Sequence, residues 1–405
     1  MVRFSSKKFF ISNAIYGICN VSFISILLTP FLRTRIQDPL LLSTTITSME
    51  VSMFIFMYIG GIIFDRFGAK FVFLFGRFID IISICLLFSK QYYLLLTSVI
   101  LQGVARGIIW GKYNSYIYNV LSLNDKINFY SRFSAGYYFF WDIACSGIAF
   151  IAKFLLRTNN NNYNILILLS IVLKLTSVIA ICISIPNNNK SIKTLEFQTK
   201  SLKEIILTIK NCVKQDKMFL YLLIFYGFLH YSAYPFASVI GDMILLDIGF
   251  SQSEVSSFMG TLFMIMSIGT LIPLILLPKG ISIKNVVLLS KIQLFLLFIS
   301  IIFYNSKMIS YTLFLIGITF SLCEVSVEKE FEKVSNKKIR GTVISLSMCI
   351  MIIMKIFNTM LIGLLADKFS YHIGGVIVVF IMFVSIIIFS ICLSFIVKKN
   401  KMIKQ

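Results

Sequence analysis

The sequence has few charged residues, few prolines and few histidines. Of its 405 residues, 14% are charged, six are proline and two are histidine, whereas 58% are hydrophobic. In soluble domains about a quarter of all residues are charged, so this composition excludes an ordinary soluble domain. We therefore expect an integral membrane protein. Because a membrane span with its connection needs roughly 30 to 35 residues, the chain has room for about a dozen spans and no sizeable soluble domain.

Several catalytic and nucleotide-binding motifs are also absent. The chain contains no Gly-x-x-x-x-Gly-Lys loop followed by Ser or Thr, which argues against ATP-driven transport by this chain alone. His230 and His372 are its two histidines, and it has neither a His-Glu-x-x-His zinc motif nor a Gly-x-Ser-x-Gly elbow. Its eight cysteines show no paired spacing. We expect no enzymatic activity, no cofactor and no bound metal.

Basic residues outnumber acidic ones. The chain has 38 lysines and arginines against 17 aspartates and glutamates, and its formal charge is +21. In a soluble protein this excess would raise the question of nucleic acid binding. If both termini are cytoplasmic, however, most of the basic residues outside the spans fall in cytoplasmic segments, as the positive-inside rule requires. The excess therefore indicates an orientation in the membrane and no nucleic acid partner.

Apolar runs of about 18 residues or more, separated by polar clusters, predict twelve membrane spans. The first six lie at residues 10–32, 40–64, 71–88, 92–119, 133–156 and 164–185. The other six lie at residues 218–246, 251–277, 285–304, 308–327, 341–364 and 373–397. We expect an all-α membrane protein with 12 transmembrane helices in two six-helix bundles and with both termini cytoplasmic.

The longest segment between predicted spans divides the chain into two halves. It is rich in lysine, and apolar residues recur in it at helical spacing. This spacing fits an amphipathic helix on the cytoplasmic membrane surface, and equally a solvated linker that is helical. We predict an N-terminal bundle at residues 1–185, a cytoplasmic linker at residues 186–217 and a C-terminal bundle at residues 218–405.

A short polar motif lies between the second and third predicted spans. It reads GGIIFDRFGAK and contains Gly61, Asp65, Arg66, Gly68 and Lys70. Gly61 would let two helices approach closely, and Gly68 would allow a tight turn. The two basic residues would hold the loop on the cytoplasmic side. The aspartate can accept hydrogen bonds at a helix N-terminus.

This motif resembles the loop 2-3 signature of the major facilitator superfamily, a Gly, three residues and then Asp-Arg-x-Gly-x-Lys. The resemblance extends to the fourth, fifth and eleventh predicted spans, which are similar to those of bacterial drug-efflux-like members. It implies a transporter in which Asp65 helps to latch the two halves on the cytoplasmic side, with the start of the eleventh span at Arg340 as acceptor. Ala69 stands where a second basic residue is common, so one latch contact is in doubt.

Ionisable side chains inside the predicted spans are candidate functional residues, because a charge in a membrane is costly unless it is paired or hydrated. Arg106, among three glycines of the fourth span, is our candidate for binding an anionic group, with a structural pair to Asp142 as the alternative. The apolar surroundings of Asp142 favour a protonated carboxyl that could carry a proton. His230 is either a hydrogen-bonded structural residue or a proton relay. Trp110 and Tyr234 would suit a substrate with an apolar or ring portion.

Two further charges lie at similar depth in different halves of the chain. Glu50 in the second span and Lys355 in the eleventh are each about 10 residues from the outer end of their helix, or about 15 Å deep. We hypothesise a salt bridge between halves that breaks when the outer side opens; the alternative is two charges that the cavity solvates separately. Arg77 and Asp80, three residues apart, predict a structural pair, whereas Lys174 has no obvious partner.

Two functions fit this sequence better than an intramembrane enzyme. The first is a secondary transporter that moves a small organic solute by alternating access, with proton coupling left open because the Gly-Pro signature of many proton antiporters is missing from the fifth span. The second is a non-transporting membrane receptor or scaffold on the same fold. The expected partners are a small-molecule substrate, the lipid bilayer and, in the coupled case, protons. We expect a monomer in a bacterial inner (plasma) membrane.

Overall fold

The computed structural model describes residues 6–110, 112–122, 124–126, 129–158, 163–185, 241–275, 283–303, 308, 311–319 and 340–402. These residues form helices joined by short turns, and no strand occurs among them. Within them, six helices are long and apolar enough to cross a membrane. The prediction of an all-α membrane protein is confirmed for this part of the chain. The predicted linker, residues 186–217, lies outside it.

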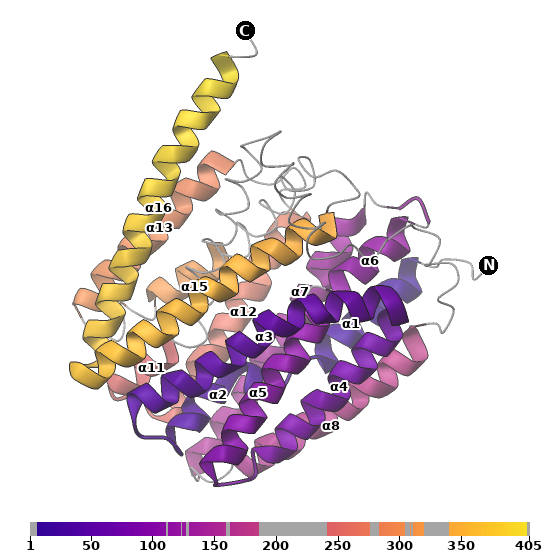
Figure 1. Cartoon of the computed structure of the whole chain (residues 1–405), viewed down its shortest axis with the longest axis horizontal. Helices are drawn as coiled ribbons and strands as arrows, with labels where there is room; N and C mark the ends of the chain where they lie inside the picture. The colour runs from indigo at the N-terminus through magenta and orange to yellow at the C-terminus, as the bar shows by residue number, and fades with distance from the viewer. Residues whose placement is uncertain are drawn as a thin grey trace.

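The N-terminal half follows the predicted spans, with two interruptions (Figure 1). Predicted span 10–32 is divided into two helices, and so is predicted span 92–119. The other four predicted spans are single helices. In order, the helices are α1 (Ser6–Cys19), α2 (Ile24–Arg33), α3 (Pro39–Phe67), α4 (Ala69–Leu86), α5 (Tyr92–Ile109), α6 (Lys112–Ser122), α7 (Tyr130–Thr158) and α8 (Tyr163–Ser184).

Helices also lie within the predicted spans of the C-terminal half. Predicted span 218–246 is described only from residue 241, and span 308–327 only at residues 308 and 311–319, all of which are helical. The four remaining spans each contain one long helix. The helices are α11 (Gly241–Asp247), α12 (Gln252–Ile275), α13 (Ile283–Ile302), α15 (Arg340–Lys368) and α16 (Tyr371–Met402).

The break between α1 and α2 is stabilised by side chains of α8. Residues 20–23 leave the helical path, which frees backbone groups inside the membrane. Lys174 Nζ donates a hydrogen bond to the Asn20 carbonyl oxygen at 2.6 Å, and the Phe23 N–H donates to Ser170 Oγ at 3.0 Å. Non-helical backbone at membrane depth is tolerated where the protein satisfies it in this way.

The motif between the second and third spans forms the turn from α3 to α4. The two helices are separated by Gly68 alone, which has a φ of +83°. This left-handed conformation is readily adopted by glycine and disfavoured for other residues. The Gly68 N–H donates to the Phe64 carbonyl oxygen at 2.9 Å, and Lys70 Nζ donates to the Cys182 carbonyl oxygen at 3.0 Å. The motif therefore fixes a tight turn that α8 supports.

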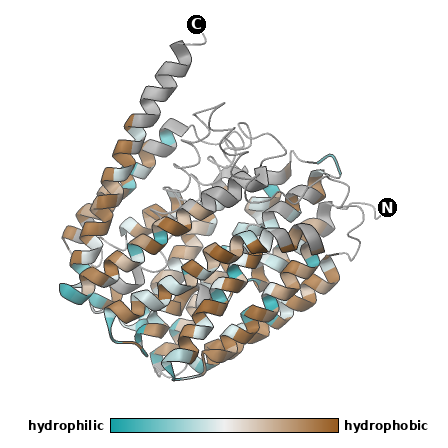
Figure 2. Cartoon of the chain, in the orientation of Figure 1, coloured by the Kyte–Doolittle hydropathy of each residue, from teal (hydrophilic) through white to brown (hydrophobic). Residues whose placement is uncertain are grey.

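Apolar residues cover the outside of the molecule as well as its interior (Figure 2). On α8 the polar residues face inward, since Ser170, Lys174 and Ser177 are buried. Large apolar residues are exposed on the same helix at three- or four-residue spacing, alongside the polar Asn164 and Thr176: Ile165, Leu168, Val172, Leu175, Ile179 and Ile183. A helix with its polar face inside and its apolar face outside suits a lipid environment, not water.

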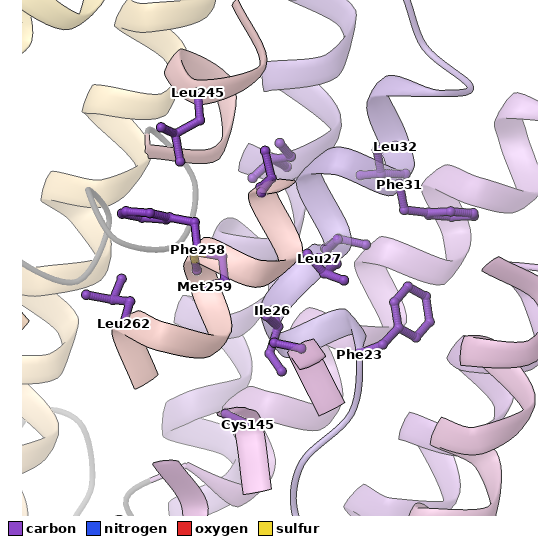
Figure 3. Packing of buried hydrophobic residues seen from close by; sticks show 14 of the residues in the cluster. Phe23, Ile26, Leu27, Phe31, Leu32, Cys145, Leu245, Phe258, Met259 and Leu262 are labelled. Carbon is purple, nitrogen blue, oxygen red and sulfur yellow. The ribbon is translucent and has the colours of Figure 1, made fainter. Parts of the chain in front are cut away.

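One large apolar core joins the two halves of the chain. It packs α2 and α7 of the N-terminal half against α11 and α12 of the C-terminal half. Figure 3 shows part of it, with Phe23, Ile26, Leu27, Phe31, Leu32 and Cys145 near Leu245, Phe258, Met259 and Leu262. This core lies toward the end of the molecule that holds the α2–α3, α4–α5 and α15–α16 connections (Figure 1). We call this the distal end; in the predicted orientation it is the outer side.

Candidate functional site

Two pairs of helices bring the halves together. The helix α3 packs against α15, and α7 packs against α12. These helices occupy the second, eleventh, fifth and eighth predicted spans. In the second pair, Ser146 Oγ donates to the Gly260 carbonyl oxygen at 2.8 Å, and Ser253 Oγ donates to the Lys153 carbonyl oxygen at 3.1 Å.

The α3–α15 contact is antiparallel, and three pairs of residues fix its register. From the distal end inward, Ser43 lies against Gly363, Glu50 pairs with Lys355, and the sulfur atoms of Met57 and Cys349 are 4.0 Å apart. A Cβ atom at Gly363 would overlap the side chain of Ser43, so the two helices pack tightly near the distal end. The contact is therefore closed on the distal side of the ion pair.

The structure brings Glu50 and Lys355 together in an ion pair that we call the interface pair. Lys355 Nζ donates to Glu50 Oε1 at 2.5 Å, and the residues are 5% and 1% exposed, respectively. The geometry is that of a salt bridge between halves and not of two separately solvated charges. Removing one partner of such a buried pair leaves an uncompensated charge and is strongly destabilising.

Polar side chains lie beside the interface pair on its distal side. Thr47 precedes Glu50 by one turn of α3, and Asn358 and Thr359 follow Lys355 by one turn of α15. All three are buried. Within the described part of the chain, both threonine hydroxyls, both amide atoms of Asn358 and Glu50 Oε2 have no hydrogen-bond partner. Buried polar atoms are normally satisfied, so this set needs an explanation.

Apolar side chains lie on the other side of the interface pair. Met53, Met57, Met351 and Ile352 form a buried cluster, which we call the Met cluster, and Trp110 packs against it. The interface pair thus separates a polar distal part of the α3–α15 contact from an apolar part. Trp110, a predicted substrate contact, lies at this contact between halves.

A second buried ionic group, which we call the Asp80 cluster, lies inside the N-terminal half. Asp80 Oδ2 is 3.1 Å from Arg77 Nη1 and 3.1 Å from Lys174 Nζ. Arg77 also donates to Asn20 Oδ1 and, at 3.4 Å, to the Tyr16 hydroxyl. The predicted pair of Arg77 with Asp80 is confirmed. Lys174 is the third member, which sequence spacing could not reveal because α8 meets α4 only in the folded chain.

Arg106 lies at the edge of the Asp80 cluster and is half-buried. Its charge acts on Asp80 and Lys174, and no ion pair joins it to Asp142 among the described residues. Two of the glycines near Arg106, Gly103 and Gly107, face α3. A Cβ at Gly107 would lie 2.6 Å from the Met53 carbonyl oxygen, so these glycines let α3 and α5 pack closely.

The other candidates differ in their surroundings. Asp142 is buried on α7 and forms no ion pair in the part of the chain that the structure describes. Gly61 lies beside Lys112, a buried lysine that the sequence reading missed and that donates to the Met57 carbonyl oxygen at 3.2 Å. The side chains of Asp65, Arg66 and Arg340, and the whole of His230 and Tyr234, lie outside the described residues.

Tyrosines of α1, α6 and α7 pack against one another. Tyr113, just after the break between α5 and α6, stacks on Tyr16 with ring centroids 4.1 Å apart and donates to Asn13 Oδ1 at 2.5 Å. Tyr137 accepts a hydrogen bond from Asn20 Nδ2 at 2.7 Å. These rings are buried against one another, so they form part of the core of the N-terminal half.

Comparisons with known proteins agree with this architecture. The crystal structure of a mutant of the nucleoside transporter NupG matches with a TM-score of 0.73 and 13% identity, over 94% of this chain and 99% of that chain. The crystal structure of a D-xylose–proton symporter matches with a TM-score of 0.69 and 12% identity, over 93% of this chain and 96% of that chain. The human organic anion transporter MFSD10 (TETRAN) matches with a TM-score of 0.61 and 11% identity, over 95% of this chain and 98% of that chain. At these identities the likeness shows the fold and not the substrate.

A search of curated protein sequences found no match. The family model described as the Major Facilitator Superfamily, however, matches residues 9–346, which is most of the chain. This match, the transporter structures of the same fold and the apolar helices lead to one conclusion. The chain is an integral, multi-pass membrane protein that belongs to the Major Facilitator Superfamily of membrane transporters.

Proposed function

We propose that this protein is a secondary active transporter that moves a small organic solute by alternating access. In this proposal twelve spans form two six-helix bundles, residues 1–185 and 218–405, and residues 186–217 join them on the cytoplasmic side, where both termini also lie. The two bundles rock about a central site. The protein works as a monomer in a bacterial inner membrane, and a substrate or proton gradient supplies the energy.

The observation that carries this proposal is the interface pair. Glu50 and Lys355 form a buried ion pair where the two halves meet. Such a pair favours two arrangements: closed and dry, or open with both charges hydrated, because an intermediate state would leave buried charges unpaired. We propose that the pair holds the distal side closed and breaks when that side opens. The cytoplasmic side would be held by Asp65 and the start of α15 at Arg340.

The substrate site in this proposal is centred on Arg106. A half-buried guanidinium in the middle of a predicted span, without an ion-pair partner among the described residues, suits an anionic group on the solute. Trp110 and Tyr234 would contact its apolar or ring portion. Asp142 and His230 remain the candidates for a proton that travels with the solute.

Flux into proteoliposomes tests the proposal. A labelled panel of nucleosides, sugars, organic anions and drugs is offered with and without an imposed proton gradient. We expect flux of one class of solute, abolished by Arg106→Ala and reduced by Asp65→Asn. Arg157→Ala serves as the control, since this arginine is exposed at the end of α7. Specific binding of a solute without any flux would favour the receptor or scaffold function instead.

A further inference from the structure

The Asp80 cluster and Arg106 together carry more positive than negative charge. Arg77, Lys174 and Arg106 are three cations, and Asp80 is the one carboxylate that acts on them in the described part of the chain. We call these four residues the charged group; its net charge is +2. A surplus charge at membrane depth is costly unless an opposite charge or water compensates it.

The packing of α4 against α5 places Arg106 alongside the rest of the charged group. The two helices are antiparallel neighbours, and Ser98 Oγ donates to the Ser83 carbonyl oxygen at 2.7 Å. The register that this bond sets places Gln102 beside Asp80. Arg106 follows Gln102 by one turn, so the two residues share one face of α5.

The accessible part of Asp80 faces the interior of the protein. The exposed apolar residues of α4 mark its lipid-facing side: Phe71, Phe75, Phe78 and Ile82. Asp80 is two residues from each of the last two, so it projects from the opposite side of the helix. Its side chain is nevertheless 12% exposed, against 3% for Arg77 and for Lys174. Space that solvent can reach therefore lies inside the bundle, next to the charged group.

Two side chains at this place have a buried polar atom without a partner among the described residues. They are Arg77, whose Nε is a donor, and Gln102, whose Oε1 is an acceptor. Asp80 uses the same oxygen, Oδ2, for both of its ion pairs. Buried polar atoms are normally satisfied by protein, water or ligand. Surplus positive charge and unused hydrogen-bonding capacity thus occur together.

We propose that the charged group binds a solute with two negative charges, a dianion such as a dicarboxylate or a phosphate monoester. This inference rests on the proposed transporter function and names its substrate class. Arg106 is half-buried, and its planar guanidinium can hold a carboxylate or a phosphate through two parallel hydrogen bonds. Asp80 fixes Lys174 and Arg77, which supply the remaining positive charge.

Charge balance is the reason for two negative charges and not one. A dianion cancels the net charge of the charged group, whereas a monoanion or a neutral solute leaves a surplus at membrane depth. Coulomb energies are several times larger there than in water, so this difference should dominate the selectivity among solutes of similar shape.

Binding of matched charge series to the purified full chain in lipid nanodiscs tests this inference. Succinate, succinamate and succinamide have nearly the same shape and carry two, one and no negative charges at pH 8. Ethyl phosphate and diethyl phosphate form a second series, with two charges and one. We expect the dianion of at least one series to bind about tenfold or more tightly than its monoanion in isothermal titration calorimetry. The series that shows the preference identifies the carboxylate or the phosphate.

Two variants test whether these residues set the charge preference. Gln102→Glu adds a carboxylate beside Asp80 and lowers the net charge by one, so the dianion should lose its advantage over the monoanion. Arg106→Gln lowers the net charge equally and removes the guanidinium, and we expect about tenfold weaker binding of the dianion and the same loss of preference. Arg157→Gln is the control, since this arginine is exposed at the end of α7, and it should keep the preference of the parent.

Two outcomes would overturn the inference. One is a parent protein that binds no dianion, or binds it no more tightly than the monoanion or the neutral compound, which needs no variant to fold. The other is a preference for the dianion that survives unchanged in either variant. The two proposals fail separately: flux of a neutral solute into proteoliposomes supports the transporter and contradicts the dianion site, and tight dianion binding without any flux contradicts the transporter.

Discussion

The two buried ionic groups of this protein differ in how completely their polar atoms are satisfied. In the Asp80 cluster, one carboxylate faces two cations, Lys174 also binds the Asn20 carbonyl oxygen, and of the buried ionic atoms only Arg77 Nε lacks a partner among the described residues. At the interface pair, one carboxylate oxygen and the polar groups of Thr47, Asn358 and Thr359 lack partners in the part of the chain described. A group within one half can be satisfied permanently, whereas a group between halves must also be stable when the halves separate.

The largest expected effect is the loss of the Asp80 cluster. Asp80→Ala leaves Arg77 and Lys174 buried without their carboxylate, and we expect the protein to lose about 3–5 kcal/mol of stability. Thermal unfolding in detergent, followed by fluorescence, measures the change. Asp367→Ala is the matched control, because this aspartate is exposed and its loss should change stability by less than about 0.5 kcal/mol. Equal effects of the two variants would show that the cluster has no special structural role.

Charge exchange at the interface pair should affect transport more than folding. We expect Glu50→Lys and Lys355→Glu each to lower flux at least about tenfold, since each leaves two like charges at the contact. The double variant should recover part of the flux, with a coupling energy of about 1–3 kcal/mol in a double-mutant cycle. Flux assays in proteoliposomes measure all four proteins. A double variant as inactive as the single variants would argue against a salt bridge that functions as a pair.

The glycines of α5 should hold α3 within the N-terminal half. Gly107→Ala places a Cβ against the Met53 carbonyl oxygen, and we expect a loss of about 1–3 kcal/mol because backbone must move. Gly147→Ala is the control on α7, where a Cβ meets nothing within 4 Å. There the better helix propensity of alanine should leave stability unchanged or raise it by up to about 1 kcal/mol. Thermal unfolding separates the two outcomes, and similar losses would contradict the packing.

The smallest expected effect concerns the break in the first span. Ser170→Ala removes the acceptor of the Phe23 N–H, and we expect a loss of about 1 kcal/mol. Ser177→Ala, on the same face of α8, removes a buried hydroxyl that has no partner among the described residues, so it should be neutral or slightly stabilising. Unfolding of the two variants side by side provides the measurement. A loss in Ser177→Ala and none in Ser170→Ala would contradict the role of α8 in holding the break.

The sequence predicted the fold better than the details of the site. Long apolar runs report burial in lipid directly, so the helices fell where the runs are. The breaks at residues 20–23 and near Trp110 were missed, because their stabilising partners come from other helices and leave no local signal. The pairing of Glu50 with Lys355 could be anticipated because equal depth on two contacting spans limits the possible partners. The ion pair of Lys174 with Asp80 and the hydrogen bond from Lys112 to the Met57 carbonyl oxygen depend on how the helices pack, which the spacing of residues along the chain does not reveal.

A reversible crosslink at the contact between halves tests alternating access most directly. Met57→Cys faces Cys349, where the sulfur atoms of the present residues are 4.0 Å apart, so a short bifunctional methanethiosulfonate reagent should join α3 to α15 through two reducible disulfides once the other cysteines are replaced. Met57→Cys with Cys349→Ser is the control that cannot form this bond. We predict that crosslinking stops solute flux, that reduction restores it, and that the control is unaffected. Continued flux through the crosslinked protein would contradict the account.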